Sequence, residues 1–257
     1  MSMEDYIAAR KEGIKQLHAL ESRGQDPYLP VLAELVPKLN QMAQVPLGLV
    51  QIGLDQIEGT ATKGRTTAFA RGFLPLLEQD SEFATKWSIL YDGIVEDGLR
   101  QPIVALEYYN RFYIVEGNKR VSVMRRLDAV NIEANVTRVL PEAEDSERYR
   151  VYQEFLSFYA DTKLNFIVFS REGSYERLYK LIGKTPGEKW TPEDLFDFQS
   201  CFYRFQQAYA EQAGSQPPMP ACDALLIYLE VFGYEDSVEK TPAEFGQEIE
   251  RIWSEFV

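Results

Sequence analysis

IVEGNKRVSVMRRL, residues 114–127, passes from a short apolar run through one glycine into three polar residues, and then resumes apolar positions at helical spacing. The apolar run predicts a strand, and the spacing after Gly117 predicts a helix. The first turn of a helix has unpaired backbone N–H groups and the positive end of the helix dipole, so anions are favoured there. The stretch therefore predicts a strand–turn–helix unit that can hold a phosphate at its turn.

Five residues at this turn carry the predicted chemistry. Gly117 lets the backbone approach a phosphate closely, and Asn118 can donate from its amide. Lys119 and Arg120 can neutralise charge, the arginine by a two-pronged contact. Glu116 either holds a magnesium ion or acts as a base in phosphoryl transfer, or it faces away from the ligand. A glycine here is also often only a turn, and the cations are often only solvated, so these residues alone leave both interpretations open.

The sequence on both sides of the turn predicts a mixture of strands and helices. Strands are predicted at 45–57, 102–106, 112–115 and 132–139, helices at 67–79 and 83–97, and a polar turn at 58–64. Gly98 follows the second helix directly and is a good C-terminal stop. The hydrophobic pattern thus indicates a small domain with a sheet in the middle of the chain.

The two ends of the chain are predicted to be helical. Residues 1–44 read as two helices broken at 24–27. Beyond Pro141 the helices are acidic and rich in aromatic residues, which we interpret as core residues: Phe155, Phe158, Tyr159, Phe196, Phe198, Phe202, Tyr203, Phe205 and Tyr209. Two of these helices begin with a capping threonine, a proline and an acid, at 191–194 and 241–244. The final helix, predicted from 242 to 257, has no stop signal, so we expect the chain to be the front portion of a longer protein.

Composition excludes several classes of protein. The net charge is −13, and residues 151–257 hold 9 of the 27 Lys and Arg but 18 of the 40 Asp and Glu, so broad binding to a duplex is not expected. The cysteines Cys201 and Cys222 have neither CxxC spacing nor a histidine cluster, and His18 has no companions, so no zinc site is predicted. The sequence has no run of eighteen apolar residues and does not open with a signal peptide, which predicts a cytoplasmic protein without a membrane span.

The order of these motifs resembles the ParB/sulfiredoxin-like superfamily over roughly residues 45–140. The resemblance rests on a helix ending Ile94-Val-Glu-Asp-Gly-Leu-Arg-Gln-Pro-Ile103, a strand, and the Gly-x-x-Arg turn 117–120 that opens a helix. It implies an α/β (α+β) fold, with a small mixed sheet like that of the nuclease-like N-terminal domain of bacterial ParB proteins. It also implies a nucleotide phosphate at the turn, as ParB proteins hold CTP and sulfiredoxin holds ATP.

Carried over residue by residue, the resemblance implies a wider site. Gly117 would be the backbone cradle, Arg120 the phosphate arginine, and Asn118 and Lys119 the variable polar positions. The remaining implied contacts lie at the helix-to-strand corner and in an earlier loop: Glu96, Gly98, Lys63 and Arg65. ParB proteins usually have Gly-Glu-Arg-Arg at the turn, so Asn118 argues against metal-assisted hydrolysis. No cysteine stands where sulfiredoxin has its reactive one, so that activity is excluded.

We therefore expect three parts: a helical arm at 1–44, a ParB/sulfiredoxin-like domain at 45–141 and a helical domain at 142–257. The first hypothesis is a module that binds a nucleoside triphosphate, CTP or ATP with or without magnesium, and relays its presence to a protein partner or to downstream domains. The second is an enzyme of the same fold, a metal-dependent nuclease or phosphotransferase with Glu116 as its catalytic residue. The third is a scaffold that keeps the fold without a ligand.

Overall fold

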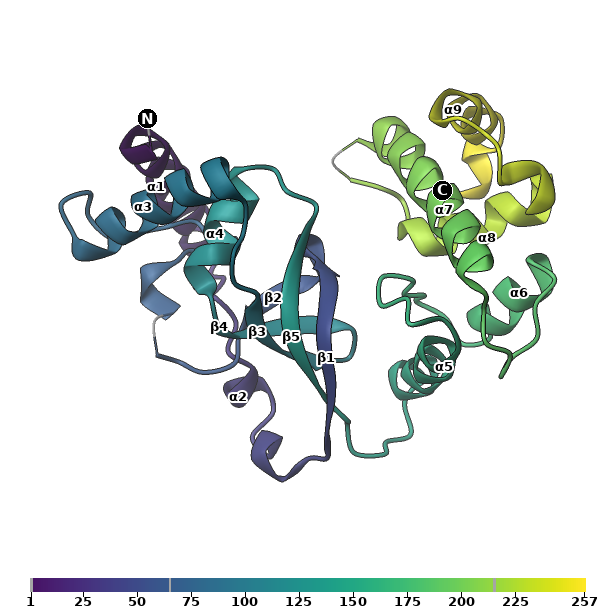
Figure 1. Ribbon diagram of the computed structural model, residues 1–257, viewed down its shortest axis with the longest axis horizontal. Helices are drawn as coiled ribbons and strands as arrows, with labels where there is room; N and C mark the ends of the chain where they lie inside the picture. Colours follow the sequence, from purple (N-terminus) through teal and green to yellow (C-terminus); the bar gives the residue numbers. More distant parts are fainter. Residues whose placement is uncertain (1, 65, 215) are drawn as a thin grey trace. The chain divides into compact units, whose positions relative to one another are not determined.

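A computed structural model describes residues 2–64, 66–214 and 216–257, and the chain forms two compact units, Met1–Glu142 and Ala143–Val257. Each unit has its own set of helices (Figure 1). Among the residues described, no helix is long and apolar enough to cross a membrane.

The first unit contains a five-stranded mixed sheet in the order β1-β5-β3-β4-β2. The strands are β1 (Gln44–Gly53), β2 (Ile57–Thr60), β3 (Ile103–Tyr108), β4 (Arg111–Glu116) and β5 (Asn131–Val139). β3 and β4 form an antiparallel hairpin, β5 lies parallel to β3, and β2 lies parallel to β4. β1 pairs antiparallel with β5 at one edge. The predicted α/β (α+β) fold with a mixed sheet is confirmed.

Helices α1 (Ser2–Glu21), α3 (Glu82–Asp97) and α4 (Asn118–Arg126) share one hydrophobic core with the strands. Alternate residues of β3 are buried because successive side chains of a strand point to opposite faces. Trp87 of α3 is fully buried and donates from its indole N–H to Ser122 of α4 at 2.9 Å. This bond holds the middle of α4 against α3.

Local signals explain why α3 begins and ends where it does. The Ser81 hydroxyl accepts a hydrogen bond from the backbone N–H of Ala84, which satisfies one of the unpaired groups of the first turn. Gly98 ends the helix with a φ of 75°, a conformation that favours glycine. The helix predicted at 83–97 and the hairpin predicted after it are confirmed.

Three predictions between residues 28 and 79 are wrong. Only a short helix, α2 (Leu32–Leu35), forms between Pro30 and Pro37, because proline interrupts a helix. The predicted turn at 58–64 begins instead as β2. The predicted helix at 67–79 is a short 3₁₀ turn, Thr66–Ala68, followed by irregular chain in which Phe73 has a φ of 62°.

Arg125, a partly buried cation at the end of α4, ties the irregular chain to its neighbours. Its guanidinium donates to the carbonyl oxygens of Leu54 at 2.8 Å, Ile57 at 2.9 Å and Gly72 at 3.1 Å. It also lies 5.0 Å from the ring centre of Phe73. Burial lowers the pKa of this guanidinium. Contacts distant in sequence therefore set a loop that local patterns assign to a helix.

The second unit consists of α5 (Glu147–Thr162), α6 (Ser174–Leu181), α7 (Pro192–Ala213), α8 (Ala221–Phe232) and α9 (Pro242–Arg251). Both predicted capping boxes are present, at Thr191 and Thr241. The final helix ends at Arg251, so the prediction that it continues to residue 257 is wrong.

Aromatic side chains fill the interior of this second unit. Buried members of the predicted set include Phe155, Phe158, Phe198, Phe202 and Phe205, which are at most 2% exposed. Phe196 and Tyr203 are 70% and 40% exposed, so their assignment to the core is wrong. Cys201 and Cys222 are buried thiols.

Candidate functional site

The turn between β4 and α4 has the geometry that its sequence predicts. Gly117 is the N-cap of α4, with φ 113° and ψ 19°. A Cβ atom on it would lie 2.6 Å from Cγ2 of Ile103, so a side chain is excluded by contact as well as by backbone conformation. The first backbone N–H groups of α4 lack helical partners at this point. The turn therefore holds β4 close to β3 and leaves donors at the start of a helix.

A pocket of about 430 Å³, which we call the α4 pocket, opens beside this turn. One wall is the continuous segment Glu116 to Arg120, and the rest is apolar, from Phe69, Phe83, Leu90 and Val115. All five turn residues predicted from sequence line this one pocket. A polar wall facing aromatic rings is an arrangement that suits small ligands with a charged end and a flat or apolar end.

Two of the wall residues present polar groups of opposite character. The Lys119 ammonium lies 4.6 Å from the ring centre of Phe83, so the aromatic face stabilises the cation at the pocket. The Oδ1 atom of Asn118 is buried and has no hydrogen-bond partner within the described chain. A buried polar atom without a partner is unfavourable, so a donor group bound beside Asn118 would be stabilised.

Arg120 has structural partners of its own. Its guanidinium donates to the backbone oxygens of Gln101, at 3.1 Å, and Pro102, and to the Glu116 carboxylate at 3.0 Å. The side chain is only 15% exposed. Arg120 thus ties the start of α4 to the loop before β3. Its role as a phosphate arginine stays a prediction, and an anion in the pocket would compete with Glu116 for it.

The Glu116 side chain is 71% exposed and forms its ion pair with Arg120. Within the described residues, no three His, Cys, Asp or Glu side chains come close enough together to hold a metal ion. The catalytic role of Glu116 stays a prediction.

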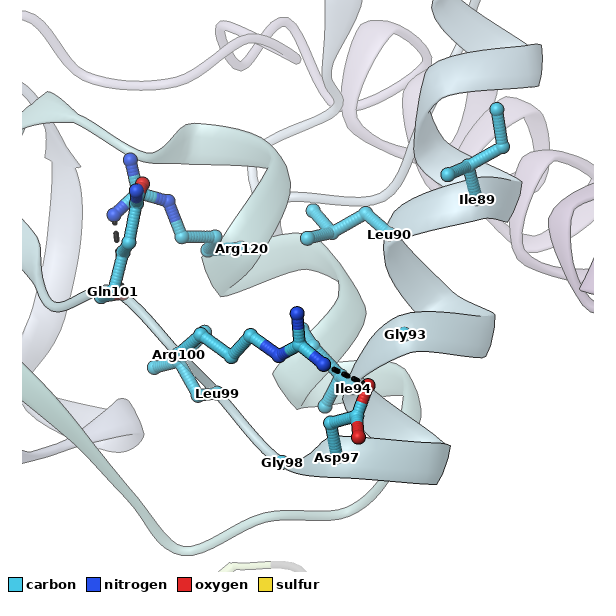
Figure 2. Close-up of a pocket in the computed structure, with 10 residues that line it drawn as sticks. All are labelled: Ile89, Leu90, Gly93, Ile94, Asp97, Gly98, Leu99, Arg100, Gln101 and Arg120. Carbon is cyan, nitrogen blue, oxygen red and sulfur yellow. Dashed lines mark hydrogen bonds and ion pairs between the residues drawn. The ribbon is translucent and has the colours of Figure 1, made fainter.

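A second pocket of about 340 Å³, which we call the α3 pocket, lies between the C-terminal half of α3 and the loop that follows it (Figure 2). Gly98 lines this pocket, together with Leu99, Arg100 and Gln101. Leu90 and Arg120 line both pockets, which makes the two neighbours. Gly98, which was predicted to contact the nucleotide together with the turn residues, therefore lines the α3 pocket and not the α4 pocket.

The other predicted residues lie outside both pockets. Glu96 is exposed on α3 and is not among the described residues that line either one. Lys63 is 79% exposed, and its ammonium lies 2.7 Å from Oε1 of Glu34, whose carboxylate raises the pKa of this lysine. The described linings do not include Lys63 either. Arg65 lies outside the described residues.

Sequence reasoning missed the apolar half of the α4 pocket. Phe83 and Leu90 are seven residues apart, which places them on the same side of α3, but that spacing is also the signal of a core stripe. Phe69 falls in the segment wrongly predicted as a helix. Only the fold places these three side chains opposite the turn.

Comparison with known proteins does not identify a family for this chain. No protein-family model matches the sequence, and no curated protein matches it. Among solved structures, the chain is similar to sulfiredoxin from Arabidopsis thaliana, with 20% identity and a TM-score of 0.25 over 34% of this chain and 82% of that one. A likeness this weak carries no argument about ligand or activity.

Proposed function

We propose that the first unit binds a phosphate-bearing small molecule in the α4 pocket, that a nucleoside triphosphate is the first candidate, and that the chain acts as a regulatory binding module. One observation carries the proposal: the polar wall of the pocket is the continuous segment from Glu116 to Arg120 at the start of α4, with Gly117 in a glycine-only conformation. Backbone donors, the helix dipole and the Lys119 ammonium all favour an anion at that wall.

The other wall supports a ligand larger than a free phosphate ion. Leu90 and Val115 add apolar surface to the pocket, and Phe69 and Phe83 line it from the core, which suits a ligand with a flat or apolar part. The buried Oδ1 of Asn118 would accept a hydrogen bond from a ligand hydroxyl, such as that of a ribose. A nucleotide combines an anionic end, hydroxyl groups and a flat base, so it meets each of these features.

The experiment is calorimetric titration of the whole chain with CTP, ATP, GTP and their diphosphates, each with and without magnesium. Lys119→Ala should weaken binding by about tenfold, since a charge-assisted contact to an anion contributes about 1.4 kcal/mol or more. The matched control is Lys86→Ala, which removes an equally charged side chain from α3 that pairs with Glu82 and is 62% exposed.

The two variants give a clear decision. Binding that Lys119→Ala weakens and Lys86→Ala leaves unchanged supports the α4 pocket as the site. Binding weakened equally by both variants would indicate a general charge effect, and absence of heat with every nucleotide would refute the proposal. Turnover of a bound nucleotide that Glu116→Gln abolishes would favour the enzyme of the same fold instead.

A further inference from the structure

The α3 pocket has a lining of a different character from that of the α4 pocket. Its walls are mainly aliphatic, from Ile89, Leu90, Ile94 and Leu99. Ile89 is 66% exposed although it is fully apolar. The volume of about 340 Å³ lies within the range of small-molecule sites, which are mostly apolar with a few placed polar groups.

The charged groups of the α3 pocket are two guanidinium groups and one carboxylate. Arg100 extends from the loop toward the end of α3, where it pairs with Asp97 (Figure 2). The Arg100 side chain is 74% exposed, and exposed ion pairs are weak because water screens them. The pair can therefore exchange Asp97 for another carboxylate without a large loss of stability.

Arg120 contributes to the pocket in a different way. Its hydrogen bonds to the oxygens of Gln101 and Pro102 hold the loop that forms one wall, so the pocket exists before any ligand arrives. Each guanidinium already has a carboxylate partner, Asp97 for Arg100 and Glu116 for Arg120, so the charges at this pocket nearly balance. Arg120 is 15% exposed and Arg100 is 74% exposed, so Arg100 is the cation that a ligand anion reaches more easily. A ligand with one negative charge can take the place of Asp97 at Arg100, whereas a phosphate dianion would meet stronger repulsion from Asp97.

We infer that the α3 pocket binds an aliphatic monocarboxylate, whose hydrocarbon chain packs against Ile89, Ile94 and Leu99 and whose carboxylate pairs with Arg100. Aliphatic walls match a hydrocarbon chain, and a guanidinium matches the two oxygens of a carboxylate. Binding here does not require a nucleotide in the α4 pocket, although Leu90 and Arg120 line both pockets.

The test is a titration of the whole chain, labelled in Ile and Leu methyl groups, followed by NMR. Octanoate is the probe, and the methyl groups of Ile89 and Ile94 report on the pocket, while that of Ile7 on α1 is the spectator. Octanoate should shift the two reporters in a saturable way. Hexanoate should bind about tenfold more weakly, because two fewer methylene groups are buried. Octylamine, which has the same chain and the opposite charge, should bind more weakly than octanoate.

A pair of arginine variants tests the charged contact. Arg100→Gln should weaken octanoate binding by about tenfold, as expected for the loss of a charge-assisted hydrogen bond. Arg71→Gln is the matched control, because Arg71 is also exposed and pairs with Glu58 in the same unit. It should leave the affinity unchanged.

Three kinds of result would overturn the inference. The first is the absence of saturable shifts at Ile89 and Ile94. The second is equal binding of octanoate and octylamine, or equal octanoate affinity of Arg100→Gln and the wild type, because either would show that the carboxylate does not pair with Arg100. The third is a dependence of the reporter signals on protein concentration without probe, which would mean that a second copy of the chain covers the pocket.

Discussion

Replacement of Arg125 by methionine should destabilise the first unit far more than the same replacement at Arg126. Methionine keeps an unbranched chain that can pack on Phe73, so the change removes mainly the hydrogen bonds and the charge. Three backbone oxygens, those of Leu54, Ile57 and Gly72, would lose their guanidinium donor.

The magnitude follows from the contacts. A hydrogen bond from a charged donor contributes about 1.5–3 kcal/mol, and three such bonds set an upper bound. Burial of the guanidinium, which lowers its pKa, is unfavourable and offsets part of that sum. We expect a net loss of about 2–4 kcal/mol for Arg125→Met. Arg126 forms longer ion pairs, at 3.4 Å to Asp5 and 3.3 Å to Glu12, so Arg126→Met should lose less than about 1 kcal/mol.

Urea unfolding measured by tryptophan fluorescence can isolate the first unit. Trp87 is in that unit, whereas Trp190 and Trp253 are in the second, so both variants are made in a background with phenylalanine at 190 and 253. The midpoint of the Trp87 transition then reports the stability of the first unit. Losses that agree within about 0.5 kcal/mol for the two variants would refute the reasoning, because adjacent arginines would then contribute alike.

Three further outcomes are expected. Gly117→Ala should lower the stability of the first unit by about 1–3 kcal/mol, because Gly117 has a positive φ and a Cβ there would contact Ile103. Gly93→Ala on α3, where a Cβ would meet no neighbouring atom, should raise the stability by about 0.5–1 kcal/mol. An unchanged Trp87 transition in Gly117→Ala would contradict this. The hydrogen bond from Lys184 holds the pKa of Asp194 below its usual range, so this carboxylate stabilises the second unit at neutral pH and the contribution is lost as the pH falls through the folded-state pKa. Asp194→Asn should therefore make helix melting, followed by circular dichroism, less sensitive to acid, and an unchanged acid limb would argue against it. A glutamate-specific protease should cut first within the exposed segment 142–145 and yield two resistant fragments on a gel, where a ladder of many bands would be inconsistent with two compact units.

Where local signals decide the structure, the sequence was sufficient. The hairpin of β3 and β4 and the helix after Gly117 follow from alternation, from apolar spacing and from one glycine. The segment 67–79 was wrongly predicted because its apolar residues resemble a helix, while Gly72, Pro75 and the distant Arg125 impose a loop. β2 was missed because its pairing with β4 joins segments more than fifty residues apart.

The two sides of the α4 pocket differ in the same way. The polar wall is contiguous in sequence, from 116 to 120, so a linear motif was enough to name its members. The apolar wall comes from Phe69, from α3 and from Val115 of β4, and nothing in a single sequence distinguishes a ring at a cavity from a ring in the core. For the same reason the α3 pocket could not be predicted, because it depends on the path of the loop between Gly98 and Pro102.

The position of Arg120 would link ligand binding in the two proposed sites. Its guanidinium contacts Glu116 on one side and the loop oxygens of Gln101 and Pro102 on the other, so it cannot change partners in one pocket without altering the wall of the next. An anion that draws Arg120 toward the α4 pocket would loosen the loop and weaken whatever the α3 pocket holds. Linkage is reciprocal, so a ligand that tightens the loop would lower the affinity of the α4 pocket for the anion by the same factor. A single side chain would then set the sign and the size of the coupling between two ligands that never touch.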